Sequence, residues 1–146
     1  MLRCNITGNT WSFMDNFDDL QQSYGRCLRE KNFIERFYDI FFSSHPDVAG
    51  MFSKTDFNTQ RFALRRGISV AIEHASGSRL AERTMNQMAD THARTGRVPV
   101  APSLYRYWVE SLVKAVAETD PQVNDALLER WRLGMNKVVA TFSARF

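Results

Sequence analysis

Three histidines are the side chains in this 146-residue sequence best suited to acid–base or metal chemistry: His45, His74 and His92. His45 precedes a proline in a predicted turn, and His74 lies near a predicted helix end, so both are expected at the surface. The sequence has no Gly-rich phosphate loop, no Cys-x-x-Cys pair and no His-Glu-x-x-His motif. Its two cysteines, Cys4 and Cys27, are expected to be reduced and chemically idle.

His92 differs from the other two histidines because it follows Met85 and Met88 on the apolar side of a helical pattern. That pattern stops abruptly in the segment RTGRVP. A histidine in this setting is either a hydrogen-bonded core residue or a metal ligand. A ligand directs one neutral ring nitrogen into an apolar pocket while a carbonyl or hydroxyl group holds the other N–H. Preceding main-chain carbonyls, or Thr91, are the expected partners of that N–H.

Tyr38 and Gln60 are the two polar side chains that could face the same pocket. Tyr38 lies among four apolar residues in FYDIFF, so its ring is predicted to be buried and its hydroxyl needs a partner. That partner is either a main-chain carbonyl or a bound ligand. Gln60 lies on an amphipathic pattern, where a glutamine either faces solvent or turns inward.

These residues are predicted to lie on helices, because apolar residues recur at helical spacing in every long segment. Expected helices cover residues 16–30 and 32–44, and a short turn or helix carries Val48 to Phe52. Thr55 or Asp56 caps a helix that ends near Gly77. Leu80, Met85, Met88 and His92 are expected to share one face of the next segment. Pro102 starts another helix, Asp120-Pro121 is expected to start the last one, and no segment alternates like a strand.

The composition supports one all-α domain with six to eight helices. The chain has seven glycines, four prolines and 44% hydrophobic residues, which suits a packed core with few turns. We expect a domain at 15–146 preceded by a loose extension at 1–14. The net charge of +3 is too small to indicate nucleic-acid binding, and no apolar run is long enough to cross a membrane. A cytoplasmic protein is the default expectation.

The order of these residues resembles the globins, specifically bacterial single-domain globins similar to the haem domain of flavohaemoglobins. The resemblance runs from about Phe33 to Phe142 and is densest in FIERFYDIFFSSHPDVAGMF. TQRFALRRGI is similar to the family's distal helix, and THARTGRVPVAPSLY is similar to its proximal segment. The implied fold is a globin fold around a haem pocket.

The resemblance implies a role for each matching residue. His92 is the iron ligand of haem b, and Tyr38 and Gln60 are the distal hydrogen-bond donors to a bound diatomic ligand. The haem-binding residues implied are Phe52, Leu64, Met88, His92 and Tyr105. Without the resemblance, Phe52, Leu64 and Met88 are ordinary core residues. Arg65 and Arg66 are either solvated or close to the haem propionates.

The function implied is binding of O₂, with NO and CO as competing ligands, by a monomer or homodimer. Conversion of NO with O₂ to nitrate is a further implied activity. The family's flavin and nicotinamide modules do not follow in this sequence, so an external reductase is expected. The family also places a glutamate beside the proximal histidine, at a position that matches Phe146. The missing carboxylate weakens the expectation of peroxidase-like chemistry and of strong dioxygenase tuning.

Two alternatives belong to other functional classes. One is a haem-based gas or redox sensor that signals to a partner protein through exposed helix faces. The other is a haem-free helical interaction module, against which the combination of His92, Tyr38 and Gln60 argues.

Overall fold

The computed structural model describes residues 15–146, and this part of the chain is helical without a strand. Seven α-helices and one 3-10 turn follow one another. The elements are α1 (Asp18–Arg29), α2 (Phe33–Ser44), α3 (Pro46–Met51), α4 (Phe57–Ala75), α5 (Arg79–His92), η2 (Pro102–Leu104), α6 (Tyr105–Thr119) and α7 (Asp125–Ala144). The predicted extension at 1–14 lies outside the described residues.

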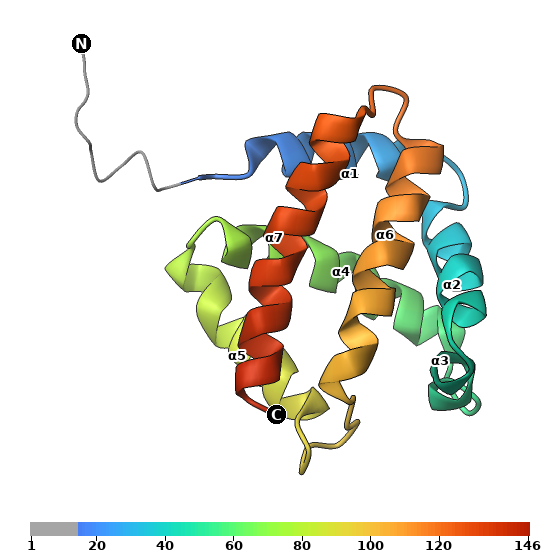
Figure 1. The fold of residues 1–146 in the computed structure, drawn as a ribbon, viewed down its shortest axis with the longest axis vertical. Helices are drawn as coiled ribbons and strands as arrows, with labels where there is room; N and C mark the ends of the chain where they lie inside the picture. The colour runs from blue at the N-terminus through green and yellow to red at the C-terminus, as the bar shows by residue number, and fades with distance from the viewer. Residues whose placement is uncertain (1–14) are drawn as a thin grey trace.

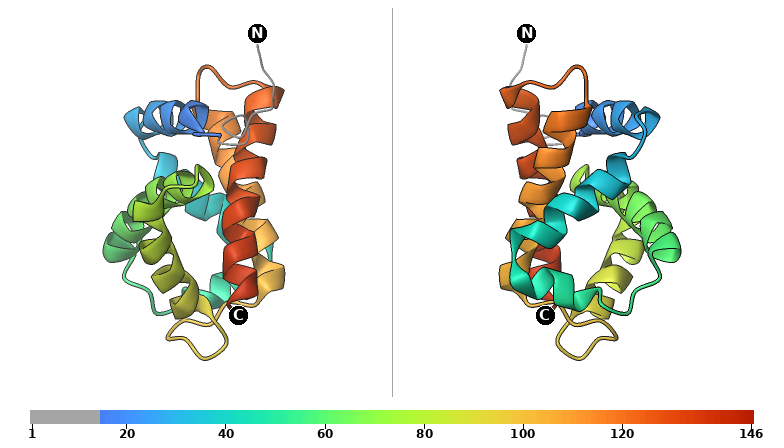
Figure 2. Two further views of the ribbon diagram at one scale, coloured as in Figure 1. Left: turned by 90° about the vertical axis from the view of Figure 1, so that its left-hand side faces the viewer. Right: turned by 90° about the vertical axis from the view of Figure 1, so that its right-hand side faces the viewer.

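The helices enclose the core from several directions. α6 and α7 run side by side, α1 crosses one end of the pair, and the chain ends beside α5 (Figure 1). From the side, α4 and α5 form one wall and α6 and α7 the other, with α2 and α3 between them (Figure 2). α2 packs most extensively on α6, while α7 contacts α4, α5 and α6. Helices α4 and α5 therefore both pack on α7.

Local sequence signals account for most of the helix boundaries. Asp56 caps α4 as predicted, because its carboxylate accepts the main-chain N–H of Asn58 at 3.0 Å. Gly77 follows α4 with a φ of 86°, a backbone conformation that glycine adopts without a steric penalty. Pro46 occupies the first turn of α3, so α2 ends at Ser44 as expected.

The core contains the apolar residues that helical spacing predicted, with one exception. Phe37, Ile68, Leu112, Trp131 and Met135 are completely buried. Leu80 was expected on the buried face of its helix, but its side chain is 92% exposed. Leu80 is only the second residue of α5, and its helical angle differs from that of Met85 and His92, so it points to solvent.

The prediction that Asp120-Pro121 starts the last helix is wrong. Asp120 is the residue that ends α6, and Asn124 caps α7 by accepting the Leu127 N–H at 2.8 Å. Asp120 is buried and accepts hydrogen bonds from Arg26 and Ser23 instead. A long-range ion pair therefore overrides the local capping signal.

The structure also tests two expectations from the sequence, one about Cys27 and one about the two histidines expected at the surface. Cys27 is buried, and burial raises the pKa of its thiol to about 12, so it stays protonated and unreactive. His45 and His74 are half-buried rather than fully on the surface. Nδ1 of His45 accepts the Asp47 N–H at 3.0 Å, and Nε2 of His74 lies 2.9 Å from the Thr141 hydroxyl. No described helix is long and apolar enough to cross a membrane.

Candidate ligand-binding site

His92 is the last residue of α5, and the loop that follows folds back onto it. The main-chain N–H groups of Val98 and Val100 donate to the carbonyls of Thr91 and His92, at 2.9 and 3.0 Å. In turn, Nδ1 of His92 lies 3.0 Å from the Val98 carbonyl oxygen. A carbonyl only accepts, so this bond requires the proton to sit on Nδ1. In the neutral ring, Nε2 then carries the free lone pair, which is the form that binds a metal.

The type of partner predicted for the His92 N–H is therefore confirmed, but its identity is not. Thr91 and the preceding carbonyls were the expected acceptors. The Thr91 hydroxyl instead donates to the Gln87 carbonyl at 3.0 Å, and the acceptor comes from the loop after the helix. A main-chain carbonyl has no sequence signature, so sequence could not single out Val98.

Gly96 lets the loop come this close to the end of α5. Its N–H donates to the Ala93 carbonyl at 2.8 Å. A Cβ atom at this position would overlap the main-chain carbonyls of Asp90 and Thr91. The loop that supplies the Val98 carbonyl therefore depends on a residue without a side chain.

An aromatic pair from α6 and α7 covers His92. The Phe142 ring lies 5.8 Å from the imidazole, and Tyr105 packs edge-on against Phe142 at 5.5 Å, measured between ring centroids. Burial raises the pKa of Tyr105 to about 12. Phe146 matches the position of the family's glutamate by its spacing from Trp131, but the ring beside the imidazole is that of Phe142. Phe146 packs against Arg94 instead.

The imidazole has no carboxylate partner among residues 15–146. None of the ion pairs in this part of the chain includes His92. The hydrogen bond from Nδ1 to the Val98 carbonyl is the contact in the described part of the chain that polarises the ring.

Tyr38 lies in a second aromatic group, built from α2, the start of α4 and the turn between them. Its ring centroid is 5.6 Å from Phe42, 6.0 Å from Phe52 and 5.7 Å from Phe57. The side chain is only 5% exposed. Burial raises the pKa of Tyr38 to about 12, although hydrogen bonding to Gln60 and the charge of Arg61 oppose the rise. The hydroxyl therefore remains a neutral donor at physiological pH.

The Tyr38 hydroxyl has one long hydrogen bond, to the main-chain carbonyl of Gln60 at 3.5 Å. Of the two partners considered from sequence, the structure shows the main-chain carbonyl. Hydroxyl donors normally lie 2.5–3.0 Å from their acceptors, so this bond is weak. A buried hydroxyl with a weak partner is available to a better acceptor.

Gln60, whose carbonyl contacts this hydroxyl, and Leu64 lie one turn apart on α4. Gln60 is half-buried and Leu64 is 8% exposed. Among the other predicted residues, Phe52 and Met88 are half-buried and pack against the core. Arg65 and Arg66 are exposed. The structure thus joins Tyr38, Phe52 and Gln60 in one group and His92 and Tyr105 in another.

The two groups come from different helices. One belongs to α2, α3 and α4, and the other to α5, α6 and α7. The sequence did not indicate that Phe42, Phe57 and Phe142 belong to these groups, because an aromatic side chain at helical spacing looks the same in a core as beside a ligand.

Metal binding in the described part of the chain would rest on one protein ligand. No group of three or more His, Cys, Asp or Glu residues in 15–146 is placed to hold a metal ion. A metal held by His92 alone must bring its other ligands with it, as a metal in a macrocycle does.

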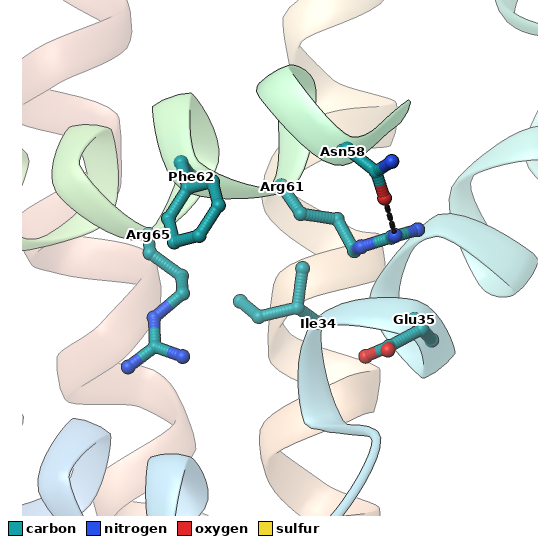
Figure 3. Close-up of a pocket in the computed structure, with 6 residues that line it drawn as sticks. All are labelled: Ile34, Glu35, Asn58, Arg61, Phe62 and Arg65. Atoms are coloured by element: carbon teal, nitrogen blue, oxygen red, sulfur yellow. Dashed lines mark hydrogen bonds between the residues drawn. The ribbon is translucent and has the colours of Figure 1, made fainter. Parts of the chain in front are cut away.

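A separate cleft of about 310 Å³ lies between α2 and α4 (Figure 3). It is lined by Ile34, Glu35, Asn58, Arg61, Phe62 and Arg65. Arg61 donates to the Asn58 side chain at 2.6 Å, and Phe62 is 74% exposed. None of the predicted site residues lines this cleft, so it is not the predicted site.

Comparison with known proteins identifies the family. No protein-family model matches the chain, and no curated protein matches it. Among solved structures, a crystal structure from Pseudomonas aeruginosa PAO1 matches with a TM-score of 0.85 and 30% sequence identity. The match covers 90% of this chain and 98% of that one, which is described as structurally highly homologous to a human hemoglobin.

The fold is therefore a globin fold. The chain belongs to the globin family.

Proposed function

We propose that this globin binds haem through Nε2 of His92 and uses the haem to bind O₂, NO or CO. The observation that carries the proposal is the hydrogen bond from Nδ1 of His92 to the Val98 carbonyl, at 3.0 Å. This bond fixes the tautomer whose Nε2 is the ligand atom, and it orients the ring. When bound, haem would supply an iron able to take a diatomic ligand.

The residues present fit such a group in two further ways. Tyr38 is a buried donor whose hydrogen bond within residues 15–146, to the Gln60 carbonyl, is long at 3.5 Å. Phe42, Phe52, Met88, Trp108 and Phe142 are large apolar side chains that remain only partly buried beside the core. A haem in contact with these residues would bury the remaining apolar surface, a gain of roughly 25 cal/mol per Å².

Each predicted site residue has a proposed task. Tyr38 donates its hydroxyl hydrogen bond to the diatomic ligand, and the Gln60 side chain assists it. Leu64 restricts space on the same side, Phe52 packs on the haem face, and Met88 and Tyr105 contact the histidine side. We expect the haem to be haem b, held without covalent bonds, because the sequence has no Cys-x-x-Cys-His attachment motif.

Conversion of NO to nitrate is the reaction we propose for this pocket. One NO, one O₂ and one electron give one nitrate ion, and the electron must come from an external reductase. Support comes from the resemblance to flavohaemoglobin haem domains and from the neutral donor at Tyr38. NO consumption measured in the presence of O₂ and a reductase, with nitrate as the product, tests this activity.

An absorption spectrum of the purified protein with added haem tests the proposal most directly. We expect a Soret band that shifts on reduction and again on exposure to CO. His92→Gly should lose the normal spectrum, and free imidazole should restore it by filling the space left by the side chain. His45→Gly is the matched control, because His45 caps α3 away from the site. A normal spectrum from His92→Gly without imidazole contradicts the assignment of His92.

A further inference from the structure

The end of α7 contacts the chain on both sides of His92. On the side before it, Nε and Nη2 of Arg145 donate to the two carboxylate oxygens of Asp90, each at 2.9 Å. Asp90 lies two residues before His92, in the last turn of α5. A bidentate pair of this kind fixes orientation as well as distance, because the guanidinium and carboxylate groups must be coplanar.

On the side after His92, the main-chain N–H of Arg94 donates to the Phe146 carbonyl at 3.3 Å. The Arg94 guanidinium lies over the Phe146 ring, 4.5 Å from its centroid. Phe142, one turn earlier in α7, contacts the His92 ring itself. Phe142 therefore contacts position 92, Arg145 contacts position 90 and Phe146 contacts position 94. These contacts lie where the chain ends beside α5 (Figure 1).

We propose that Asp90, Arg94, Arg145 and Phe146 form a clamp that positions His92 and thereby sets how firmly the protein holds its haem. The inference rests on the proposed function, because it concerns the strength of the bond from His92 to the haem iron. These four are positioning residues, since they act through His92. Phe142 is their direct contact with the imidazole.

The clamp acts on geometry and contributes little to overall stability. The side chains of Arg145 and Asp90 are 40% and 59% exposed, and such exposed pairs typically contribute less than 1 kcal/mol. The pair nevertheless anchors the last turn of α5 beside the loop that supplies the Val98 carbonyl. Freeing that turn lets the imidazole tilt without unfolding the domain.

Substitution of Arg145 tests the clamp in three ways. Arg145→Ala should raise the rate of haem loss to an excess of a haem-free acceptor globin by about fivefold or more. Arg145→Lys keeps the charge but cannot form two parallel hydrogen bonds with the carboxylate, so it should give an intermediate rate of haem loss. The double exchange Asp90→Arg with Arg145→Asp should restore at least half of the difference, because it rebuilds the pair in reverse.

Arg132→Ala is the matched control for Arg145→Ala. Arg132 lies on α7, whose C-cap is Arg145, and makes an exposed two-bond pair with Glu110 at 2.9 and 3.1 Å. We expect the control to change haem loss by less than twofold. Equal effects of the two alanine substitutions would overturn the clamp.

Two spectroscopic readouts separate positioning from general loosening. The iron–histidine stretching band, measured by resonance Raman spectroscopy, should shift or broaden in Arg145→Ala and not in Arg132→Ala. In the haem-free protein, amide hydrogen exchange at Val98 and Val100 should become faster only in Arg145→Ala. Unchanged exchange at both amides overturns the clamp even if the band shifts. A wild-type protein without a Soret band means that the proposed function has failed, while the exchange measurement still decides whether the clamp exists.

Discussion

Tyr38 is the residue on which the ligand affinity of this globin is expected to depend most. Its hydroxyl is buried and neutral, and its hydrogen bond within residues 15–146, to the Gln60 carbonyl, is long at 3.5 Å. Turning that hydroxyl toward a diatomic ligand costs little, because the existing bond is weak. A direct bond to a partly charged ligand is stronger and slows ligand escape.

Tyr38→Phe is therefore expected to raise the O₂ dissociation rate about tenfold. This corresponds to the loss of a hydrogen bond worth about 1.4 kcal/mol. Stopped-flow mixing of the O₂ complex with excess CO measures the rate. Tyr24→Phe is the control, since the Tyr24 hydroxyl is also buried but donates to the Arg65 carbonyl at 2.7 Å in the structural core. An unchanged rate in Tyr38→Phe contradicts the proposed donor.

The pKa of Tyr38 also predicts how the effect of Tyr38→Phe depends on pH. Burial raises the pKa to about 12, so the hydroxyl is protonated and neutral at every pH below that value. The contribution of Tyr38 to slow release should then be the same from pH 6 to pH 9. A loss of the difference between wild type and Tyr38→Phe within that range would show that the hydroxyl ionises much earlier.

Among the structural elements, the loop from Ala93 to Ala101 has the most influence on the site, although it has no regular structure. It holds the tautomer of His92 through Val98, and it closes only because Gly96 lies against the carbonyls of Asp90 and Thr91. Helix α5 brings His92 to the site, but the loop decides which ring nitrogen is free. Sequence spacing alone describes the helix and not this closure.

Gly96→Ala should displace the loop and weaken haem retention. We expect a destabilisation of about 1–2 kcal/mol and a faster rate of haem loss, because the added Cβ overlaps main-chain atoms that cannot rotate away. Gly25→Ala is the control, since a Cβ at Gly25 meets no atom within 4 Å and alanine favours helix α1. Urea unfolding and haem transfer measure the two effects. A Gly96→Ala protein as stable as Gly25→Ala contradicts the close approach.

At the scale of the whole molecule, a polar network links helix α1 to α6 and α7. Trp131 donates from its indole nitrogen to the Ser23 hydroxyl at 3.0 Å, and Ser23 donates to Asp120 at 2.7 Å. Arg26 donates to the same carboxylate at 2.7 and 2.9 Å. Burial on its own would raise the pKa of Asp120, but these bonds and the Gln122 N–H lower it to about 2.

The sign of the pH dependence follows from that shift. A carboxylate whose pKa is lower in the folded state stabilises the protein above the unfolded value, near 3.8, and loses that effect as the pH falls toward about 2. Asp120→Asn should lower the free energy of unfolding by about 2 kcal/mol at pH 7. The difference from wild type should shrink between pH 4 and pH 2 in urea titrations. A difference that persists at pH 2 would contradict this role of the charge.

Local patterns in the sequence predict the helices, most of the core and the residues of the candidate site. Helical spacing, the cap at Asp56 and the proline at position 46 act over a few residues, so they can be recognised from the sequence alone. His92 stood out because a histidine on an apolar helix face needs a partner for each ring nitrogen. The order of Tyr38, Phe52, Gln60, Leu64 and His92 then indicated the globin family, which the structural comparison confirmed.

The contacts between residues far apart in the sequence are known only from the tertiary structure. The acceptor at Val98 is a main-chain carbonyl, and the neighbour of His92 is Phe142 rather than Phe146. Asp120 looked like a helix cap but pairs with Arg26, 94 residues away. Such contacts depend on how whole helices cross and on where loops close. The free energy that selects them comes from burial and long-range pairing, and no local pattern of residues encodes it.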